Sequence, residues 1–129
     1  MKVSASLENY LEEIYDLSHN DGKVRVTDLA KRIGVSKPSV NKAITNLKEQ
    51  GFILHEKYGT FELTEKGILV AKDIASRHIL LKAFLKDVLG VDDSIADEEA
   101  CLMEHCLSKD TMMKLENFLV NEDIISKKR

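Results

Sequence analysis

The chain has 129 residues, of which 43% are hydrophobic and 32% charged, a composition typical of one soluble domain or two small ones. It contains no apolar run of the roughly 18–20 residues that cross a membrane, and no signal-peptide core at its N-terminus, so we expect a cytoplasmic protein without a membrane partner. Cys101 and Cys106 lie too far apart on one helix for a disulfide, which predicts reduced thiols rather than a disulfide-stabilised secreted scaffold.

The charges are unevenly distributed, although the net charge is only −3. Residues 23–57 carry eight Lys or Arg against three acids, a local net charge of +5. Residues 87–108 carry seven acids and no Lys or Arg. One basic and one acidic segment predict two partners of opposite charge, and a basic segment suits nucleic acid.

The first helix is predicted over residues 6–17, where apolar residues recur at helical spacing. Ser4 or Ser6 can cap its start, and the turn residues 19–22 end it.

Two further helices joined by a tight turn predict a helix-turn-helix. Thr27 is a good N-cap for the first, and Gly34 can adopt the left-handed conformation that ends it. Ser36 should cap the second helix, which has Pro38 in its first turn and ends at Gly51. Its expected buried stripe consists of Val40, Ile44 and Leu47.

A β-hairpin is predicted directly after this motif. Residues 52–56 alternate in polarity, Phe61 and Leu63 resume the alternation, and Tyr58-Gly59 between them is a turn signal. A hairpin in this position is the wing of a winged helix.

A long helix is predicted over residues 65–89, capped by Thr64 and ended by Gly90. Its apolar positions are Ile68, Ala71, Ile74, Ala75, Ile79, Phe84, Leu85 and Val88. Two more helices follow, which Ser94 and Ser108 should cap. Their apolar residues are too numerous for so short a module to bury alone, so we expect a second copy of the chain to cover them.

The second helix of a helix-turn-helix enters the major groove with its N-terminal residues on base edges. Asn can pair with adenine there and Lys with guanine, whereas Ser36 and Lys57 should hold phosphates. The alternative is that these residues form only a solvated helix face, but the hairpin and the local positive charge favour DNA. The predicted DNA-binding residues are Ser36, Lys37, Ser39, Asn41, Lys42, Thr45 and Lys57. One monomer offers few base-reading groups, so we expect a symmetric dimer on a palindromic operator.

The stretch EEACLMEHCLS places Cys101, Glu104 and His105 at positions i, i+3 and i+4, which share one face of a helix. Asp97, four residues before Cys101, joins that face. A thiolate, a carboxylate and an imidazole together suit borderline metals such as Fe(II), Co(II), Ni(II) or Zn(II).

A further ligand must come from another helix, and His78, Asn9 and Glu12 are the candidates. Each candidate has an ordinary alternative: His78 as a half-buried histidine, Glu12 as a solvated acid, and Cys101 itself as a small apolar filler. Spacing alone leaves both interpretations open.

The order of these parts resembles the diphtheria toxin repressor / manganese transport regulator family of iron- or manganese-dependent transcriptional repressors. The resemblance covers essentially residues 5–120 and is carried by the helix-turn-helix and by ENYLEEIY (8–15), LTEKG (63–67), RHILL (77–81) and EEACLMEHCLS (98–108). It implies a two-domain member without the SH3-like domain.

The resemblance also implies a set of ligands for Fe(II) or Mn(II). Cys101, Glu104 and His105 match the primary metal ligands, His78 matches the histidine of a second site, and Glu12 matches a first-helix carboxylate of the manganese branch.

Three positions make the chain a hybrid of the two branches. Asn9 falls where the iron branch has Met and the manganese branch Asp, and it would coordinate through its carbonyl oxygen. Cys101 falls where the iron branch has Cys and the manganese branch Glu. Lys82 replaces a second-site Glu of the iron branch, so that site should not form as it does there. The soft thiolate favours Fe(II).

We therefore predict a mainly α protein with an N-terminal winged helix-turn-helix followed by a helical dimerisation domain. The expected parts are a DNA-binding domain (1–64), a linker helix (65–90) and a metal-binding and dimerisation domain (91–129). Without metal the acidic segment should repel itself and the domains should move. A bound ion should fix the arrangement that lets a homodimer repress genes of metal-ion homeostasis.

Two other classes of function are considered. The first is a metal-blind winged-helix regulator that responds to a small organic ligand. The second, an enzyme using a Cys–His pair on a small-molecule substrate, is not expected, since no Gly-rich oxyanion-stabilising turn lies near Cys101.

Overall fold

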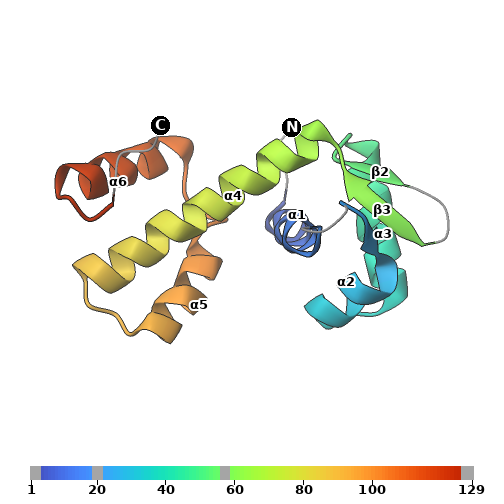
Figure 1. Cartoon of the computed structure of the whole chain (residues 1–129), viewed down its shortest axis with the longest axis horizontal. Coiled ribbons are helices and arrows are strands. Elements are labelled where there is room, and N and C mark those ends of the chain that lie inside the picture. The colour runs from blue at the N-terminus through green and yellow to red at the C-terminus, as the bar shows by residue number, and fades with distance from the viewer. Residues whose placement is uncertain (1–3, 19–21, 56–58, 126–129) are drawn as a thin grey trace. The chain divides into compact units, whose positions relative to one another are not determined.

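The computed structural model describes residues 4–18, 22–55 and 59–125, which form two compact units divided between Asp73 and Ile74 (Figure 1). The first unit contains α1 (Ala5–Leu17), β1 (Val24–Arg25), α2 (Val26–Ile33), α3 (Lys37–Glu49), β2 (Ile53–His55), β3 (Thr60–Leu63) and the start of α4 (Glu65–Ala83). The second contains the rest of α4, the π-helical turn η1 (Phe84–Val88), α5 (Asp93–Met103) and α6 (Lys109–Asn121). Within the described residues, no helix is both long enough and apolar enough to span a bilayer.

The first unit is a winged helix, as predicted. Its sheet has the order β1-β3-β2, and β3 pairs antiparallel with both neighbours. The helices α1, α2 and α3 pack with the sheet around one apolar core, whose fully buried members include Leu11, Ile14, Leu29, Leu47 and Phe61.

The connection between α2 and α3 follows the local signals of the sequence. Gly34 has φ 82° and ψ 36°, the left-handed conformation that a glycine adopts without strain. The Ser36 side chain caps α3 by accepting a hydrogen bond from the backbone N–H of Ser39, and Pro38 lies in the first turn. Val40, Ile44 and Leu47 are buried as predicted.

The predicted start of α2 is wrong by two residues. Arg25, not Thr27, is the N-cap, with extended backbone angles and no side-chain cap hydrogen bond. Arg25 is also the last residue of β1, so the chain passes from strand to helix without a capping loop. The N–H of Val26 instead donates to the carbonyl oxygen of Gly59, 3.0 Å away, on the wing.

The long helix begins after Thr64 as predicted, and the N–H of Gly67 donates to the Thr64 hydroxyl at 3.1 Å. It is α-helical only to Ala83 and then widens into η1, where the N–H of Leu89 reaches the carbonyl of Phe84. Ile79, one of the apolar positions of the predicted helix, is 64% exposed.

The second unit packs α5 and α6 against the C-terminal half of α4, around a core that includes Leu81, Leu85, Ala96, Ala100, Met112 and Leu119. Ser108 caps α6 as predicted. Ser94 does not cap α5, because it lies inside the first turn, where its hydroxyl donates to Asp92, the residue at the N-cap position.

Candidate metal centre and nucleic-acid interface

The exposed face of α3 carries the predicted DNA-reading side chains. Val40, Ala43, Ile44 and Leu47 turn the opposite face into the core. The residues left on the solvent side include Ser36, Lys37, Ser39, Asn41, Lys42 and Thr45. Lys57 lies outside the described residues.

Two local side-chain hydrogen bonds lie on this face. The Ser36 hydroxyl donates to Ser39 Oγ at 3.0 Å, and the Thr45 hydroxyl donates to the carbonyl oxygen of Asn41 at 2.9 Å. These two hydroxyls are thus used within the helix, whereas the amide of Asn41 and the ammonium of Lys42 are exposed groups able to read base edges.

One base of the positively charged segment is already neutralised. Arg32 on α2 pairs with Glu13 at 3.1 Å and with Asp16, both on α1. The hydrogen bond that Arg32 donates to the Asp16 carboxylate raises the pKa of Arg32. Partial burial raises the pKa of Glu13, although Arg32 opposes that shift. The positive charge available to DNA therefore comes chiefly from exposed lysines, among them Lys31, Lys37, Lys42 and Lys48.

The predicted primary metal ligands do not all lie on a helix. α5 ends at Met103, and Glu104 is its C-cap, with φ −60° and ψ −22°. Because these angles are still helical, the N–H of Glu104 reaches the carbonyl of Ala100 at 3.0 Å. Of the three ligands only Cys101 belongs to α5, while His105 lies in the turn that follows.

The Glu104 carboxylate is the centre of the site. Its side chain is fully buried, and burial of an ionised carboxylate is unfavourable unless cationic or hydrogen-bonding groups face it. His78 Nδ1 lies 2.9 Å from Glu104 Oε1, and His105 Nε2 lies 3.4 Å from Glu104 Oε2. The Cys101 sulfur is within 4.8 Å of a carboxylate oxygen of the same residue. The second unit thus brings a thiol, a carboxylate and two imidazoles together.

Arg77, which was not predicted from the sequence as part of this site, fixes the backbone there. Its guanidinium donates to the carbonyl oxygen of Glu104 at 3.0 Å, which satisfies one of the carbonyls left open at the end of α5. The partners are 27 residues apart in the sequence, so no local pattern predicts the contact.

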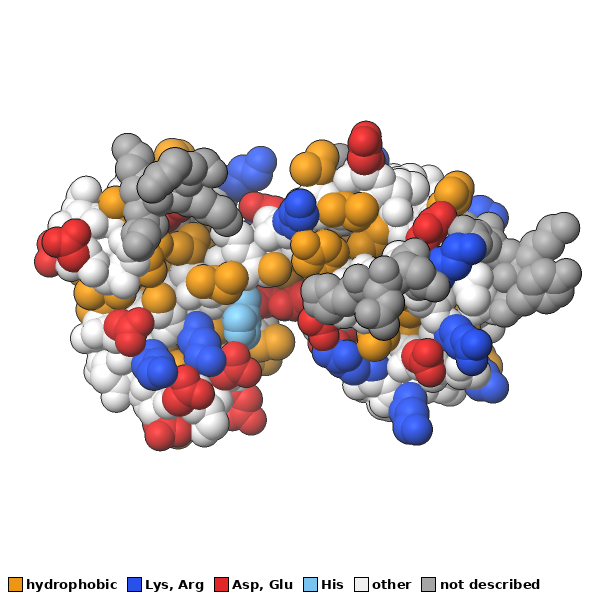
Figure 2. Space-filling view, in the orientation of Figure 1, with side chains coloured by type: hydrophobic (Ala, Val, Ile, Leu, Met, Phe, Trp, Pro, Cys, Tyr) orange, Lys and Arg blue, Asp and Glu red, His pale blue; other side chains and the backbone are white. Residues whose placement is uncertain are grey.

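A ladder of charged groups extends from His78 along α4 and α5. His78 Nε2 lies 2.9 Å from Asp97 Oδ1, and Lys82 Nζ lies 3.5 Å from both Asp97 and Asp93. Lys86 Nζ lies 2.9 Å from Asp93. The hydrogen bond from His78 lowers the pKa of Asp97, and that from Lys86 lowers the pKa of Asp93. Lys, acidic and His side chains adjoin over these helices in Figure 2.

The ladder corrects the expectation that the acidic segment only repels itself. Two lysines from just outside that segment neutralise Asp93 and Asp97. The pattern is visible in the sequence, because His78, Lys82 and Lys86 follow at intervals of four; His78 and Lys82 share one face of α4, and Lys86 lies in η1. The Lys82 ammonium lies beside Asp97. The effect of Lys82 on a second metal site stays a prediction.

The other two predicted ligands, Asn9 and Glu12, lie on α1 in the first unit, where both are half-buried. Their part in metal binding stays a prediction.

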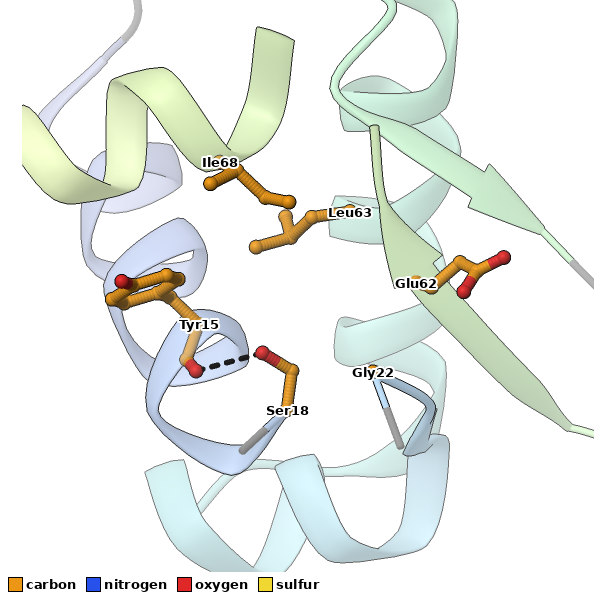
Figure 3. Close-up of a pocket in the computed structure, with 6 residues that line it drawn as sticks. All are labelled: Tyr15, Ser18, Gly22, Glu62, Leu63 and Ile68. Carbon is orange, nitrogen blue, oxygen red and sulfur yellow. Dashed lines mark hydrogen bonds between the residues drawn. The ribbon is translucent and has the colours of Figure 1, made fainter. Parts of the chain in front are cut away.

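A separate cavity of about 300 Å³ lies within the first unit (Figure 3). Its lining residues are Tyr15, Ser18, Gly22, Glu62, Leu63 and Ile68. Leu63 and Ile68 point toward one another, whereas the Glu62 carboxylate points away from them. The Ser18 hydroxyl donates to the carbonyl of Tyr15 at 2.8 Å. Its volume is at the lower end of the range of small-molecule sites in proteins.

Comparison with known families matches both halves of the chain. Residues 2–61 match the family model described as the N-terminal DNA binding domain of iron dependent repressors, and residues 64–123 match the metal binding and dimerisation domain of the same proteins. An uncharacterized HTH-type transcriptional regulator of Methanocaldococcus jannaschii is 38% identical over 118 residues, which cover 91% of this chain and 94% of that protein. The regulator MntR of Lysinibacillus sphaericus is 34% identical over 95% of this chain and 90% of its own length.

Solved structures give the same picture. A manganese-dependent transcriptional repressor in complex with manganese superimposes with a TM-score of 0.79 and 33% identity over 88% of this chain, and the manganese regulator SloR with 0.76 and 31% over 92%. The chain spans about half the length of these two proteins, 52% and 54% respectively. The family matches and the full-length relatives together show that the chain belongs to the iron dependent repressors, transcriptional regulators rather than enzymes, with a DNA-binding domain followed by a metal-binding and dimerisation domain.

Proposed function

We propose that this protein is a repressor of metal-ion homeostasis genes that binds a palindromic operator as a homodimer in the cytoplasm when Fe(II) or Mn(II) is bound. The observation that carries the proposal is the fully buried Glu104 carboxylate, with the Cys101 thiol and the imidazoles of His78 and His105 around it. Within this proposal residues 1–64 read DNA, residues 65–90 link the parts, and residues 91–129 bind metal and dimerise.

The donor set fits a divalent transition metal. Cys101, Glu104 and His105 would hold the ion, with His78, Glu12 and Asn9 as further ligands. When bound, the ion supplies the positive charge that a buried carboxylate beside a thiolate requires. The thiolate makes Fe(II) the better match to the residues, although named relatives respond to manganese.

The proposed mechanism uses the distribution of ligands along the chain. Asn9 and Glu12 precede the helix-turn-helix, whereas Cys101, Glu104 and His105 follow α4. If both groups bind one ion, the DNA-reading unit loses freedom relative to the dimer. Two recognition helices must be spaced by about 34–36 Å to enter successive major grooves, and the restricted arrangement is the one expected to meet this requirement.

The experiment that tests the function is an operator titration with and without metal. An operator is first selected from a random-sequence duplex library with Mn(II)-loaded protein, and its affinity is measured with Mn(II), with Fe(II) under nitrogen, with Zn(II) and with chelator. We expect the activating metal to raise operator affinity about 5- to 150-fold. By linkage, the operator should tighten metal binding by the same factor.

Equal operator affinity in metal and in chelator would overturn this proposal. It would favour the metal-blind regulator, for which the cavity beside Tyr15 and Ile68 is the place to search for an effector.

Formation of the homodimer can be tested by substituting exposed apolar residues of the second unit. Leu102 on α5 is 73% exposed and is, among the described residues, the most exposed large apolar side chain. Others in the same unit are Ile79, Leu89, Ile95, Met113 and Phe118. In a two-fold dimer each such residue is buried twice, so one substitution acts on both protomers.

We expect Leu102→Glu to weaken dimerisation about a hundredfold or more, the equivalent of losing two buried leucines, one from each protomer, as measured by sedimentation equilibrium. Leu69→Glu is the matched control, because Leu69 is 69% exposed on α4 but belongs to the first unit. An unchanged association constant for Leu102→Glu, or equal loss in both variants, would contradict dimerisation through this surface.

A further inference from the structure

The first turn of α4 and the preceding Thr64 are hydrogen-bonded to the segment that follows the C-terminal end of α3. The Thr64 hydroxyl donates to the carbonyl oxygen of Gly51 at 2.7 Å, and the Thr64 N–H donates to that of Phe52 at 3.0 Å. The Lys66 ammonium donates to the carbonyl oxygen of Gln50 at 3.0 Å. The carbonyls of three consecutive residues that follow α3 are thus bonded by residues of one short segment.

The position of Lys66 is favoured by two further interactions. Its Nζ lies 4.8 Å above the ring centroid of Phe52, within the range of a cation–π contact. It also places a positive charge at the negative end of the α3 dipole. Since the Phe52 side chain is buried in the core of the first unit, the contact ties α4 to the same core that supports α3.

Gly67 lets the two backbones approach closely. A Cβ atom at this position would lie 2.2 Å from the carbonyl oxygen of Phe52 and 3.1 Å from the Leu63 side chain. The first distance is impossible for any side chain, so the close packing of α4 on the segment after α3 requires glycine here.

We propose that Thr64, Lys66 and Gly67 form a clasp that transmits the orientation of α4 to α3. These are positioning residues: they fix the recognition helix relative to the helix that continues to Ala83 and carries His78. A change in the orientation of α4 caused by metal binding then rotates α3, and with it Asn41 and Lys42, by the same amount. The inference rests on the proposed function, because it assigns the route by which metal affects DNA binding.

The test compares the metal response of variants and controls, with operator affinity measured at low salt so that chelator-treated protein still binds. Gly67→Ala is the obvious variant, but its clash with backbone threatens folding, so Lys66→Met and Thr64→Val are the informative ones. We expect each to reduce the ratio of metal-loaded to metal-free operator affinity about three- to thirtyfold. Metal affinity of the free protein, measured by calorimetry, should stay as in the wild type. Lys66→Arg, which keeps a donor and a cation, should restore the ratio.

Two controls remove a charge without touching the clasp. Lys72→Met removes an exposed lysine of the same helix, and Glu65→Gln changes an exposed residue of the same turn. Both should keep the wild-type ratio.

The clasp would be overturned if Lys66→Met and Thr64→Val kept the wild-type ratio of metal-loaded to metal-free operator affinity. So would an equal loss of affinity with and without metal together with a smaller salt slope, because that is the signature of a lysine that contacts a phosphate. A wild-type ratio of one would instead overturn the proposed function, so the two failures are distinguishable.

Discussion

Replacement of Cys101 by alanine is expected to abolish metal-activated operator binding while the fold and the dimer remain. The variant removes the sulfur that lies within 4.8 Å of a carboxylate oxygen of the buried Glu104. Substitutions of groups that only orient a ligand already weaken metal binding about 10- to 100-fold, so the loss of a ligand should exceed that range. Calorimetry with Mn(II) measures the affinity, and an operator mobility-shift titration measures the functional consequence.

The fold should survive this substitution for local reasons. Cys101 is half-buried in the last turns of α5, and alanine has the highest helix propensity of any residue. The neighbouring core position is occupied by Ala100, which the variant leaves in place. The melting temperature and the sedimentation behaviour of the metal-free protein should therefore match those of the wild type.

Cys106→Ala is the matched control for Cys101→Ala. Cys106 is exposed, and its sulfur contacts the carbonyl oxygen of Leu102 at 3.7 Å. Its loss should leave both metal affinity and operator affinity unchanged. Normal metal-activated binding by Cys101→Ala would show that Cys101 is a packing residue, and the ligand set proposed for this family member would be wrong.

Local signals in the sequence were sufficient for most of the fold. Gly34 adopts the left-handed conformation that ends α2. The side chains of Ser36 and Ser108 cap the N-termini of α3 and α6. Such features depend on a few consecutive residues, and the wing follows from alternation and turn residues. The fold class was therefore predictable without any knowledge of tertiary contacts.

The errors occur where a long-range contact decides the local structure. β1 consists only of Val24 and Arg25 and exists because Val24 pairs with Phe61, far along the chain. This pairing moves the start of α2 to Val26, ahead of the capping residue that the sequence offers at Thr27. The exposure of Ile79 could not be predicted from the periodicity either, because periodicity indicates which residues share a helix face but not whether another element covers that face.

The candidate metal site was predicted in part. Spacing identified Cys101, Glu104 and His105, although α5 ends before two of them. Glu104 is contacted from α4 by His78 and Arg77, which lie 26 and 27 residues earlier. The family resemblance pointed to His78, whereas Arg77, the first residue of the same RHILL motif, was assigned no role from the sequence.

Asn41→Ala and Lys42→Ala are each expected to weaken operator binding by about 1–3 kcal/mol, the value of a base contact in the major groove. Both residues are exposed near the N-terminal end of α3, the end that approaches base edges in a helix-turn-helix. Fluorescence anisotropy with a labelled operator at saturating metal gives the affinity. Repeating it with single base-pair variants of the operator shows which position each residue reads.

Asn46→Ala and Lys48→Ala are the matched controls. They remove the same chemical groups from the last turns of the same helix, where Asn46 Oδ1 accepts a hydrogen bond from Gln50. Both should bind the operator with near wild-type affinity and unchanged base preference. If Lys48→Ala lowered affinity as much as Lys42→Ala, the lysines would act only as diffuse positive charge, and the loss would disappear at high salt.

The same variants separate DNA reading from metal binding. Asn41 and Lys42 lie in the first unit on a face that carries no predicted metal ligand, so calorimetry should find unchanged Mn(II) affinity in the absence of DNA. With operator present, the metal affinity is linked to the DNA affinity. If a substitution changes the factor by which metal raises operator affinity, the factor by which operator raises metal affinity must change equally. A collapse of metal affinity in the free variants would mean that the exposed face of α3 and the Glu104 site are one functional surface, and the proposed separation of roles would fail.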